Sequence, residues 1–331
     1  MPFALKVMIR AVMTSIPDER DATVAFGPKS VGLTNLTKVF WPKEGYTKRD
    51  LLQYYLDVKD ALLPHLRDRA MVMKRYPNGI EGEFFFMKRT PPKHPDWLRT
   101  CRIEHDSGNV IDFPIIDDAA ALMWVINLGC IDLNQWYARC DDVDRPDYLH
   151  FDLDPGAQTP FATVRKVALV VHDSLDALEM PNYAKTTGSR GIHVYVPIVR
   201  GPTQKEVWTF AKALAQTIER NHPSIATSVY TVAKRPPGTV NVDYNQNRWG
   251  STLASVYSVR PRPGAPVSMP VEWSEVKAGI EIDDFTIENA RKRIAKRGDL
   301  WAPLAPGAKG RFDLHALMPP EEKRPKRRRR S

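Results

Sequence analysis

The chain has 331 residues, of which 48 are Lys or Arg and 39 are Asp or Glu, giving a formal net charge of +9. This length allows a substantial core in one large or two ordinary domains. No apolar run approaches the roughly 18 residues of a membrane span, and the N-terminus lacks the apolar centre and cleavage site of a secretory signal. We therefore expect a cytoplasmic protein without a membrane partner, whose basic balance favours a polyanionic partner.

Three cysteines, Cys101, Cys130 and Cys140, are present in the chain. They are too few and too scattered in sequence for a disulfide framework or a zinc knuckle. We therefore expect reduced, partly buried thiols.

The first 25 residues show no clear periodicity, and we interpret them as a variable extension. A regular pattern begins at Val31. Residues 47–50 (Thr-Lys-Arg-Asp) resemble a capping box, and apolar residues follow at the helical spacing 51, 55, 58 and 62. Pro64 is expected to limit this helix.

Residues 70–114 alternate short apolar runs with turn-rich segments, which predicts strands and hairpins. Apolar residues at helical spacing over 164–178 predict a second helix, and a capping box at 203–206 begins a third. Further strands are expected over residues 148–155, 192–198, 228–232 and 240–244. Mixed strands and helices predict an α+β catalytic core rather than a helical bundle or a β-sandwich.

Two carboxylates, Asp152 and Asp154, lie two residues apart in an apolar run that Pro155 ends. In an extended strand they project from the same face, where they repel each other and are hard to bury as anions. Mg²⁺ or Mn²⁺, held between protein oxygens and a substrate's phosphates, would compensate them. The same short motif also occurs in sugar-nucleotide transferases and in solvated turns.

Residues 185–197 contain two glycines, Gly188 and Gly191, among hydroxyl residues, directly before a predicted strand. Backbone N–H groups of such a loop can approach a phosphate closely. Arg190 would add charge-assisted hydrogen bonds, and His193 could donate to a phosphate oxygen. The alternative is a tight turn followed by a structurally satisfied histidine.

A third carboxylate, Asp243, lies in another predicted strand and is followed by amide side chains. Two carboxylates on one strand and one on another can hold two cations a few ångströms apart, as two-metal phosphoryl transfer requires. One ion would activate an attacking 3′-hydroxyl, and the other would bind the triphosphate.

Taken together, the Asp-x-Asp, Gly-x-x-Gly-x-His and strand-Asp motifs closely resemble those of archaeo-eukaryotic primase-like polymerases. Residues 151–155, 188–195, 243–247 and 254–261 are similar to the polymerase domain of bacterial ligase D, which repairs double-strand breaks together with Ku. The resemblance runs from about residue 33 to residue 276. It implies a primase-polymerase core of mixed and antiparallel sheets flanked by helices. The expected domain covers residues 26–300, with a catalytic core at about 115–275 and a C-terminal segment at 301–331.

The resemblance also implies roles for individual residues. Metal-binding carboxylates match Asp152, Asp154 and Asp243. Nucleotide contacts match or lie near Lys74, Asn134, Thr187, Arg190, His193, Arg235, Gln246 and Arg260. DNA contacts match Phe85 and Phe86, which would stack on the template, and Asn35, Lys38 and Lys48, which would bind the 5′-phosphate across a gap. Without the resemblance, residues 84–86 would be interpreted as core phenylalanines and the lysines as solvated surface.

Two positions depart from the pattern of the family. Thr187 stands where ligase D polymerases usually carry serine, and Asn134 stands where they commonly carry histidine. Asparagine can donate and accept like a neutral imidazole but cannot become a cation, so sugar selectivity is in question. The asparagine is more like stand-alone members of the family in actinobacteria. The length also leaves no room for attached nuclease and ligase domains, so we expect a stand-alone protein.

The resemblance implies a bacterial, nucleoid-associated polymerase that adds nucleotides, usually ribonucleotides, to a primer 3′-hydroxyl at gaps or broken ends. Its implied cofactors are two Mn²⁺ or Mg²⁺ ions, and its implied partners are gapped DNA, Ku and a separate ATP-dependent ligase. The alternatives are a primase that starts chains de novo and a non-catalytic module that binds DNA ends. The basic run at 323–330 is expected to be disordered and to attract phosphates, unless it only aids solubility.

Overall fold

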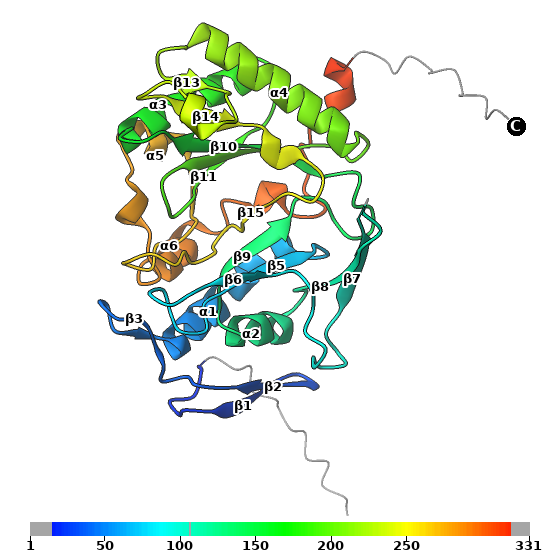
Figure 1. The fold of residues 1–331 in the computed structure, drawn as a ribbon, viewed down its shortest axis with the longest axis vertical. Coiled ribbons are helices and arrows are strands. Elements are labelled where there is room, and N and C mark those ends of the chain that lie inside the picture. The colour runs from blue at the N-terminus through cyan, green and yellow to red at the C-terminus, as the bar shows by residue number, and fades with distance from the viewer. Residues whose placement is uncertain (1–14, 106, 319–331) are drawn as a thin grey trace, which may run out of the picture.

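The computed structural model describes residues 15–105 and 107–318. The expectations for the first 14 residues and for the basic run at 323–330 lie outside this range. Among the described residues, no helix combines the length and the apolar character needed to cross a membrane. These residues form an α+β fold of two main sheets flanked by helices, which confirms the expected class (Figure 1).

The larger sheet has six strands, and the Asp-x-Asp strand lies inside it. The strands in spatial order are β13 (Ala226–Thr227), β14 (Val240–Asp243), β10 (Tyr148–Pro155), β12 (Ile192–Pro197), β11 (Tyr183–Thr186) and β16 (Pro270–Val271). All neighbours are antiparallel except β13 and β14. On β10, Leu149, Phe151 and Leu153 are fully buried. Alternation therefore leaves Asp152 and Asp154 on the other face, as predicted.

Helices α3 (Phe161–Asp176) and α4 (Gln204–Asn221) pack on this sheet, and α5 (Trp273–Ala278) packs on α3. The capping box predicted for α4 is present, with Thr203 and Glu206 each accepting the other's backbone N–H. The amphipathic pattern of α3 is also confirmed, although the helix ends before Leu178.

The second sheet has four antiparallel strands and lies below the first in Figure 1. Its order is β15 (Thr252–Ala254), β9 (Cys130–Trp136), β5 (Met71–Arg75) and β6 (Phe85–Met87). Helix α2 (Ala119–Asn127) packs on β9 and on α1 (Lys48–Leu66), which also contacts α6 (Ala290–Arg297). Three two-stranded sheets complete the fold: β1 (Ala22–Phe26) with β2 (Lys29–Leu33), β3 (Val39–Trp41) with β4 (Tyr46–Thr47), and β7 (Thr100–Glu104) with β8 (Val110–Pro114).

Helix α1 begins at its predicted capping box but continues past Pro64. Thr47 and Asp50 form the reciprocal cap, and the helix ends at Leu66. Proline removes one backbone donor and crowds the preceding turn. Pro64 lies in the last turn of α1, and the helix ends two residues after it, at Leu66.

The strand expected at residues 228–232 is wrong. The structure has only the two-residue strand β13 before this segment, and a 3₁₀ turn over Val232–Lys234 that begins at its last residue. Tyr230 and Val232 are 63% and 70% exposed. Strand propensity mainly reflects packing on a half-buried sheet, and these β-prone side chains have no such surface.

The start of the fold precedes the expected boundary at residue 25. That boundary falls inside β1, which pairs along its whole length with β2. Ile16 is also fully buried, and its backbone N–H donates to Gln53. Part of the expected extension therefore packs on the body of the domain.

The expectation of three reduced thiols is wrong for two of them. Cys101 on β7 and Cys140 after β9 form a disulfide, with their Cα atoms 5.9 Å apart. They are 39 residues apart in sequence, and the packing of the β7–β8 hairpin brings them together. Cys130 is a free, buried thiol whose pKa is raised by burial.

Candidate nucleotide and phosphate sites

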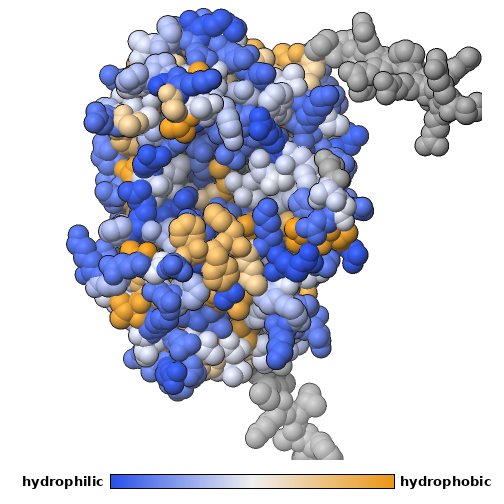
Figure 2. Space-filling model, in the orientation of Figure 1, coloured by the Kyte–Doolittle hydropathy of each residue, from blue (hydrophilic) through white to orange (hydrophobic). Residues whose placement is uncertain are grey.

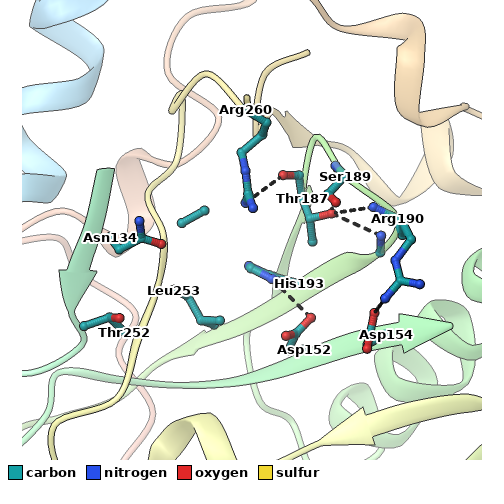
Figure 3. A pocket seen from close by; sticks show the side chains of 12 residues that line it. Asn134, Asp152, Asp154, Thr187, Ser189, Arg190, His193, Thr252, Leu253 and Arg260 are labelled. Atoms are coloured by element: carbon teal, nitrogen blue, oxygen red, sulfur yellow. Dashed lines mark hydrogen bonds and ion pairs between the residues drawn. The ribbon is translucent and has the colours of Figure 1, made fainter. Parts of the chain in front are cut away.

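The three candidate metal-binding carboxylates converge because of strand register. Asp152 on β10 lies directly opposite Asp243 on β14 and opposite His193 on β12. Directly opposed residues of antiparallel strands project from the same face. Asp243, Asp152 and His193 therefore form one row across the sheet, and Asp154 follows two residues along β10. Figure 3 shows Asp152, Asp154 and His193 on one side of a cavity.

Burial and mutual repulsion disfavour the charged form of these carboxyl groups. Burial raises the pKa of Asp152 to about 6, against the opposing effect of nearby cations, first among them Lys185. The pKa values of Asp154 and Asp243 are raised first by burial, with a further contribution from Asp152. The site therefore has negative charge that a bound cation would stabilise.

Protein groups hold each carboxylate in the described structure. Arg190 lies 3.1 Å from one Asp154 oxygen, and Arg235 lies 3.6 Å from the other. Asp243 accepts from the backbone N–H of Asn245 at 2.7 Å, and the Gln246 amide nitrogen lies 3.5 Å from its second oxygen. These contacts place the predicted residues Arg190, Arg235 and Gln246 next to the carboxylates.

The donor set fits a hard divalent cation, although the side chains are not arranged around one. Three buried or partly buried carboxylates supply the oxygen ligands that Mg²⁺ and Mn²⁺ prefer. Within residues 15–105 and 107–318, no three His, Cys, Asp or Glu side chains are grouped as a ready-made metal site. The arginines on Asp154 would have to move aside for it to serve as a ligand.

His193 is buried beside Asp152, in surroundings that favour its neutral form. Its Nε2 lies 3.2 Å from Asp152 Oδ1, and burial together with Lys185 and Arg260 holds its pKa well below the usual value. A neutral imidazole has one N–H, so Nε2 donates and Nδ1 can only accept. Nδ1 has no partner among the described residues. Donation to a phosphate therefore requires a further proton or release of Asp152.

The glycine-rich loop is organised around Thr187. Its hydroxyl oxygen accepts from the backbone N–H groups of residues 189, 190 and 191 at 3.1–3.2 Å. These three donors therefore point to Thr187 and are not free for phosphate as the sequence suggested. Since the oxygen accepts three times, its own hydrogen is left to donate outward. Thr187 lines the cavity in Figure 3.

Both loop glycines are required by close contacts. A Cβ on Gly188 would lie 2.7 Å from Arg260 Cγ and 2.9 Å from the backbone of Val267, at a φ of +61°. A Cβ on Gly191 would lie 2.2 Å from the carbonyl oxygen of Leu153. A side chain at Gly191 would therefore push the loop away from β10, and one at Gly188 would push it away from the backbone at Val267.

The cavity between the two sheets has a volume of about 260 Å³. Seven predicted residues line it: Asn134, Asp152, Asp154, Thr187, Arg190, His193 and Arg260. The wall opposite the carboxylates comes from the second sheet, where Asn134 on β9 pairs with Ala254 on β15 (Figure 3). Arg260 closes one end and donates to the carbonyl of Thr187 at 3.2 Å. The cavity thus has acidic, cationic and neutral polar walls.

A second cavity of about 260 Å³ contains the predicted 5′-phosphate residues Asn35, Lys38 and Lys48. Lys48 is the first residue of α1, where backbone N–H groups and the helix dipole favour an anion. Burial, with the nearby Lys38, lowers its pKa to about 8. Arg75, which the sequence analysis did not select, also lines this cavity.

The three consecutive phenylalanines lie at the surface rather than in the core. Phe84, Phe85 and Phe86 are 50%, 45% and 59% exposed. Figure 2 shows an apolar patch near the middle of the displayed face, where Figure 1 places β6. The Lys74 ammonium lies 4.2 Å from the Phe84 ring centre, whereas Arg75 lies over Phe85. Neighbouring strand residues alternate in direction, so Phe85 and Phe86 do not form one flat platform.

Two further residues, which contact the lining of the first cavity, escaped the sequence analysis. Arg262 donates to the Ser189 hydroxyl at 3.2 Å. Its position two residues after Arg260 could have indicated that it lies near the cavity. Asp132 is 1% exposed and lies 3.5 Å from Arg260, opposite Lys74 on the neighbouring strand. No local pattern marked Asp132, because its partners come from distant segments.

Comparisons with known proteins agree with this geometry. A family model described as the LigD primase-polymerase domain matches residues 47–301. The multifunctional non-homologous end joining protein LigD of Mycolicibacterium smegmatis is 33% identical over 276 residues, covering 83% of this chain and 36% of that protein. The bifunctional LigD of Bacillus subtilis is 29% identical, covering 80% of this chain and 42% of that protein.

The fold also matches a solved structure, the polymerase domain of Mycobacterium tuberculosis ligase D in complex with DNA. The TM-score is 0.79 at 31% identity, over 84% of this chain and 99% of that one. The chain spans about two fifths or less of the length of these curated relatives. The chain thus belongs to the family of the LigD primase-polymerase domain.

Proposed function

We propose that this protein is a DNA-repair nucleotidyltransferase that extends a primer 3′-hydroxyl, preferentially with ribonucleotides, at short gaps or broken ends. The observation that supports it most is a single cavity lined by the carboxylates Asp152 and Asp154 and by the candidate phosphate-binding residues Thr187, Arg190 and Arg260. The names of the relatives place them in non-homologous end joining.

The side chains divide into those that hold the triphosphate and those that hold the reacting end. Thr187 would donate its hydroxyl hydrogen to a phosphate, and Arg190 and Arg260 would neutralise phosphate charge. Asn134 and the β15 wall would lie against the sugar. Positioning of this kind is the main contribution a protein makes to phosphoryl transfer.

Asp152, Asp154 and Asp243 would hold two divalent cations, Mn²⁺ or Mg²⁺, that activate the attacking hydroxyl and stabilise the leaving pyrophosphate. The protein keeps these three buried or partly buried carboxylates, whose charges repel one another, next to arginines. Arg190 and Arg235 would transfer from Asp154 to the incoming triphosphate. Arg190 and Arg235 would thus pair with Asp154 when no substrate is bound and with the triphosphate when it is.

The second cavity would bind the 5′-phosphate on the far side of a gap. Lys38 and Lys48 supply the cations, Asn35 supplies an amide, and Arg75 adds a guanidinium beside them. Gapped duplex DNA would therefore be the preferred substrate, and Ku and a separate ligase are candidate partners for the complete repair reaction.

The activity is tested by extension of a labelled primer in a gapped duplex, with ribonucleotides and deoxyribonucleotides compared in Mn²⁺ and in Mg²⁺. We expect template-directed addition of one or a few nucleotides, with ribonucleotides preferred. Dinucleotide synthesis on single-stranded DNA without a primer would instead identify a primase. DNA binding without any incorporation would identify an end-binding module.

Substitution of the exposed phenylalanines is expected to weaken binding of a single-stranded template more than binding of a blunt duplex. Phe84→Ala and Phe86→Ala should weaken binding of a single-stranded template overhang by about 1–3 kcal/mol per stacked base. Phe85→Ala should act less on this overhang, because its ring lies with Arg75 on the other side of β6. Fluorescence anisotropy with overhang and blunt duplexes measures the difference. Equal losses on both duplexes would contradict stacking on the template.

A further inference from the structure

A buried lysine extends the row of catalytic side chains. Lys185 on β11 lies directly opposite His193, so the row reads Asp243, Asp152, His193 and Lys185 across four strands. Lys185 is 1% exposed. It does not line the nucleotide cavity, and the proposed chemistry gives it no task. A lysine is almost never fully buried without a specific partner.

Both hydrogen-bond acceptors of Lys185 are neutral. Its Nζ donates to the carbonyl oxygen of Ala254 at 3.0 Å and to Ser268 Oγ at 2.6 Å. Ser268 Oγ in turn donates to the carbonyl of Thr186 at 3.0 Å. Burial holds the pKa of Lys185 well below its usual value. The two contacts persist in either protonation state, because an amine also has hydrogens to donate.

The Ala254 carbonyl belongs to the opposite wall of the cavity. Ala254 ends β15 and pairs with Asn134 on β9, and both residues line the cavity. Lys185 belongs to the six-stranded sheet, which carries the carboxylates. The Lys185 side chain therefore connects the cavity wall next to the proposed sugar position with the sheet that contains the three aspartates.

We infer that Lys185 is a positioning residue that sets the distance between the Asn134–Ala254 wall and the catalytic row, and so contributes to selection of the nucleotide sugar. The inference rests on the proposed function. Lys185 acts through Ala254 and touches no substrate. A lysine that served only general stability would not affect the choice between ribose and deoxyribose.

The test compares Lys185→Met, which keeps the length but loses the donors, with Lys185→Gln, which keeps neutral donors. We expect Lys185→Met to raise KM for ribonucleotides about tenfold, the effect of one average contact. We expect kcat to stay within about threefold, because the lost interaction positions the substrate and does not appear only in the transition state. The preference for ribonucleotides should fall, and Lys185→Gln should recover part of both losses.

Two controls separate positioning from stability. Tyr54→Phe removes another buried hydrogen bond, to the carbonyl of Tyr257, and neither of these residues lines the cavity. It should lower the melting temperature without altering the sugar preference. In an Asn134→Ala background, Lys185→Met should change the sugar preference little further, because both residues act through the same wall.

Hydrogen exchange gives a readout that does not depend on activity. Backbone amides of residues 252–256 should exchange faster in Lys185→Met than in the unmodified protein, and Lys185→Gln should restore part of the protection. If exchange at residues 252–256 depends on Lys185 but the unmodified protein incorporates no nucleotide, only the proposed function is refuted. Unchanged exchange at 252–256, or an unchanged sugar preference in an active Lys185→Met protein, would overturn the positioning role.

Discussion

Asp152→Asn, Asp154→Asn and Asp243→Asn should each lower nucleotide incorporation by at least about a hundredfold, since each removes an anionic oxygen from the proposed metal-binding set. DNA binding should change little, because the 5′-phosphate cavity and the aromatic residues are untouched. Single-turnover extension of a gapped duplex, together with fluorescence anisotropy on the same duplex, measures the two effects separately.

The same variants should not be less stable than the unmodified protein. Burial raises the pKa of all three carboxyl groups, and repulsion from Asp152 adds to the shift at Asp154 and Asp243. A neutral amide of equal size therefore removes an unfavourable charge. Asp60→Asn, at an exposed side chain, is the matched control. Near-normal incorporation by any of the three variants would remove that residue from the catalytic set. A large fall in melting temperature would indicate a structural role instead.

Lys38→Ala and Lys48→Ala should remove most of the preference for a gapped duplex with a downstream 5′-phosphate. Each charge-assisted contact to the phosphate would contribute roughly 1.5–3 kcal/mol. Binding to an ungapped primer-template should change little, since that DNA presents no terminal phosphate to the cavity. Titration of phosphorylated and unphosphorylated gapped duplexes gives the comparison. Equal losses on both duplexes would mean that the lysines attract DNA only in a general way.

The 5′-phosphate preference should also fall above about pH 8. Burial and Lys38 lower the pKa of Lys48 to about 8, so the free protein loses this ammonium charge as the pH rises from 7 to 9. Phosphate binding must then restore the proton, which weakens the apparent affinity. Arg75 stays charged over this range and provides residual binding. A preference that is constant from pH 7 to 9 would contradict a role for the Lys48 charge.

Local sequence rules predicted the parts of the structure that depend on neighbouring residues. The capping boxes at Thr47 and Thr203 and the shared face of Asp152 and Asp154 follow from helix and strand periodicity. That Asp243 lies opposite Asp152 depends on strand order and register, which no single segment specifies. The sequence motifs suggested that the three aspartates could share a site, but only the family resemblance predicted that they do.

Features that depend on tertiary packing were missed or predicted wrongly. The Cys101–Cys140 disulfide requires the β7–β8 hairpin to pack beside the end of β9. The segment around Tyr230 has strand-forming residues but no buried face to receive them. The partners of Lys185 come from residues 254 and 268, far along the chain. Sequence periodicity contains no information about such contacts.

The most direct test of the account is the position of bound Mn²⁺ in crystals grown with a non-hydrolysable nucleoside triphosphate and a gapped duplex. We predict anomalous density for Mn²⁺ ions that are bound by the carboxylate oxygens of Asp152, Asp154 and Asp243. The triphosphate should contact Thr187, Arg190 and Arg260. Arg190 and Arg235 should have left Asp154 for the phosphates. Mn²⁺ or triphosphate bound elsewhere, with Asp154 still paired to both arginines, would contradict the proposed active site.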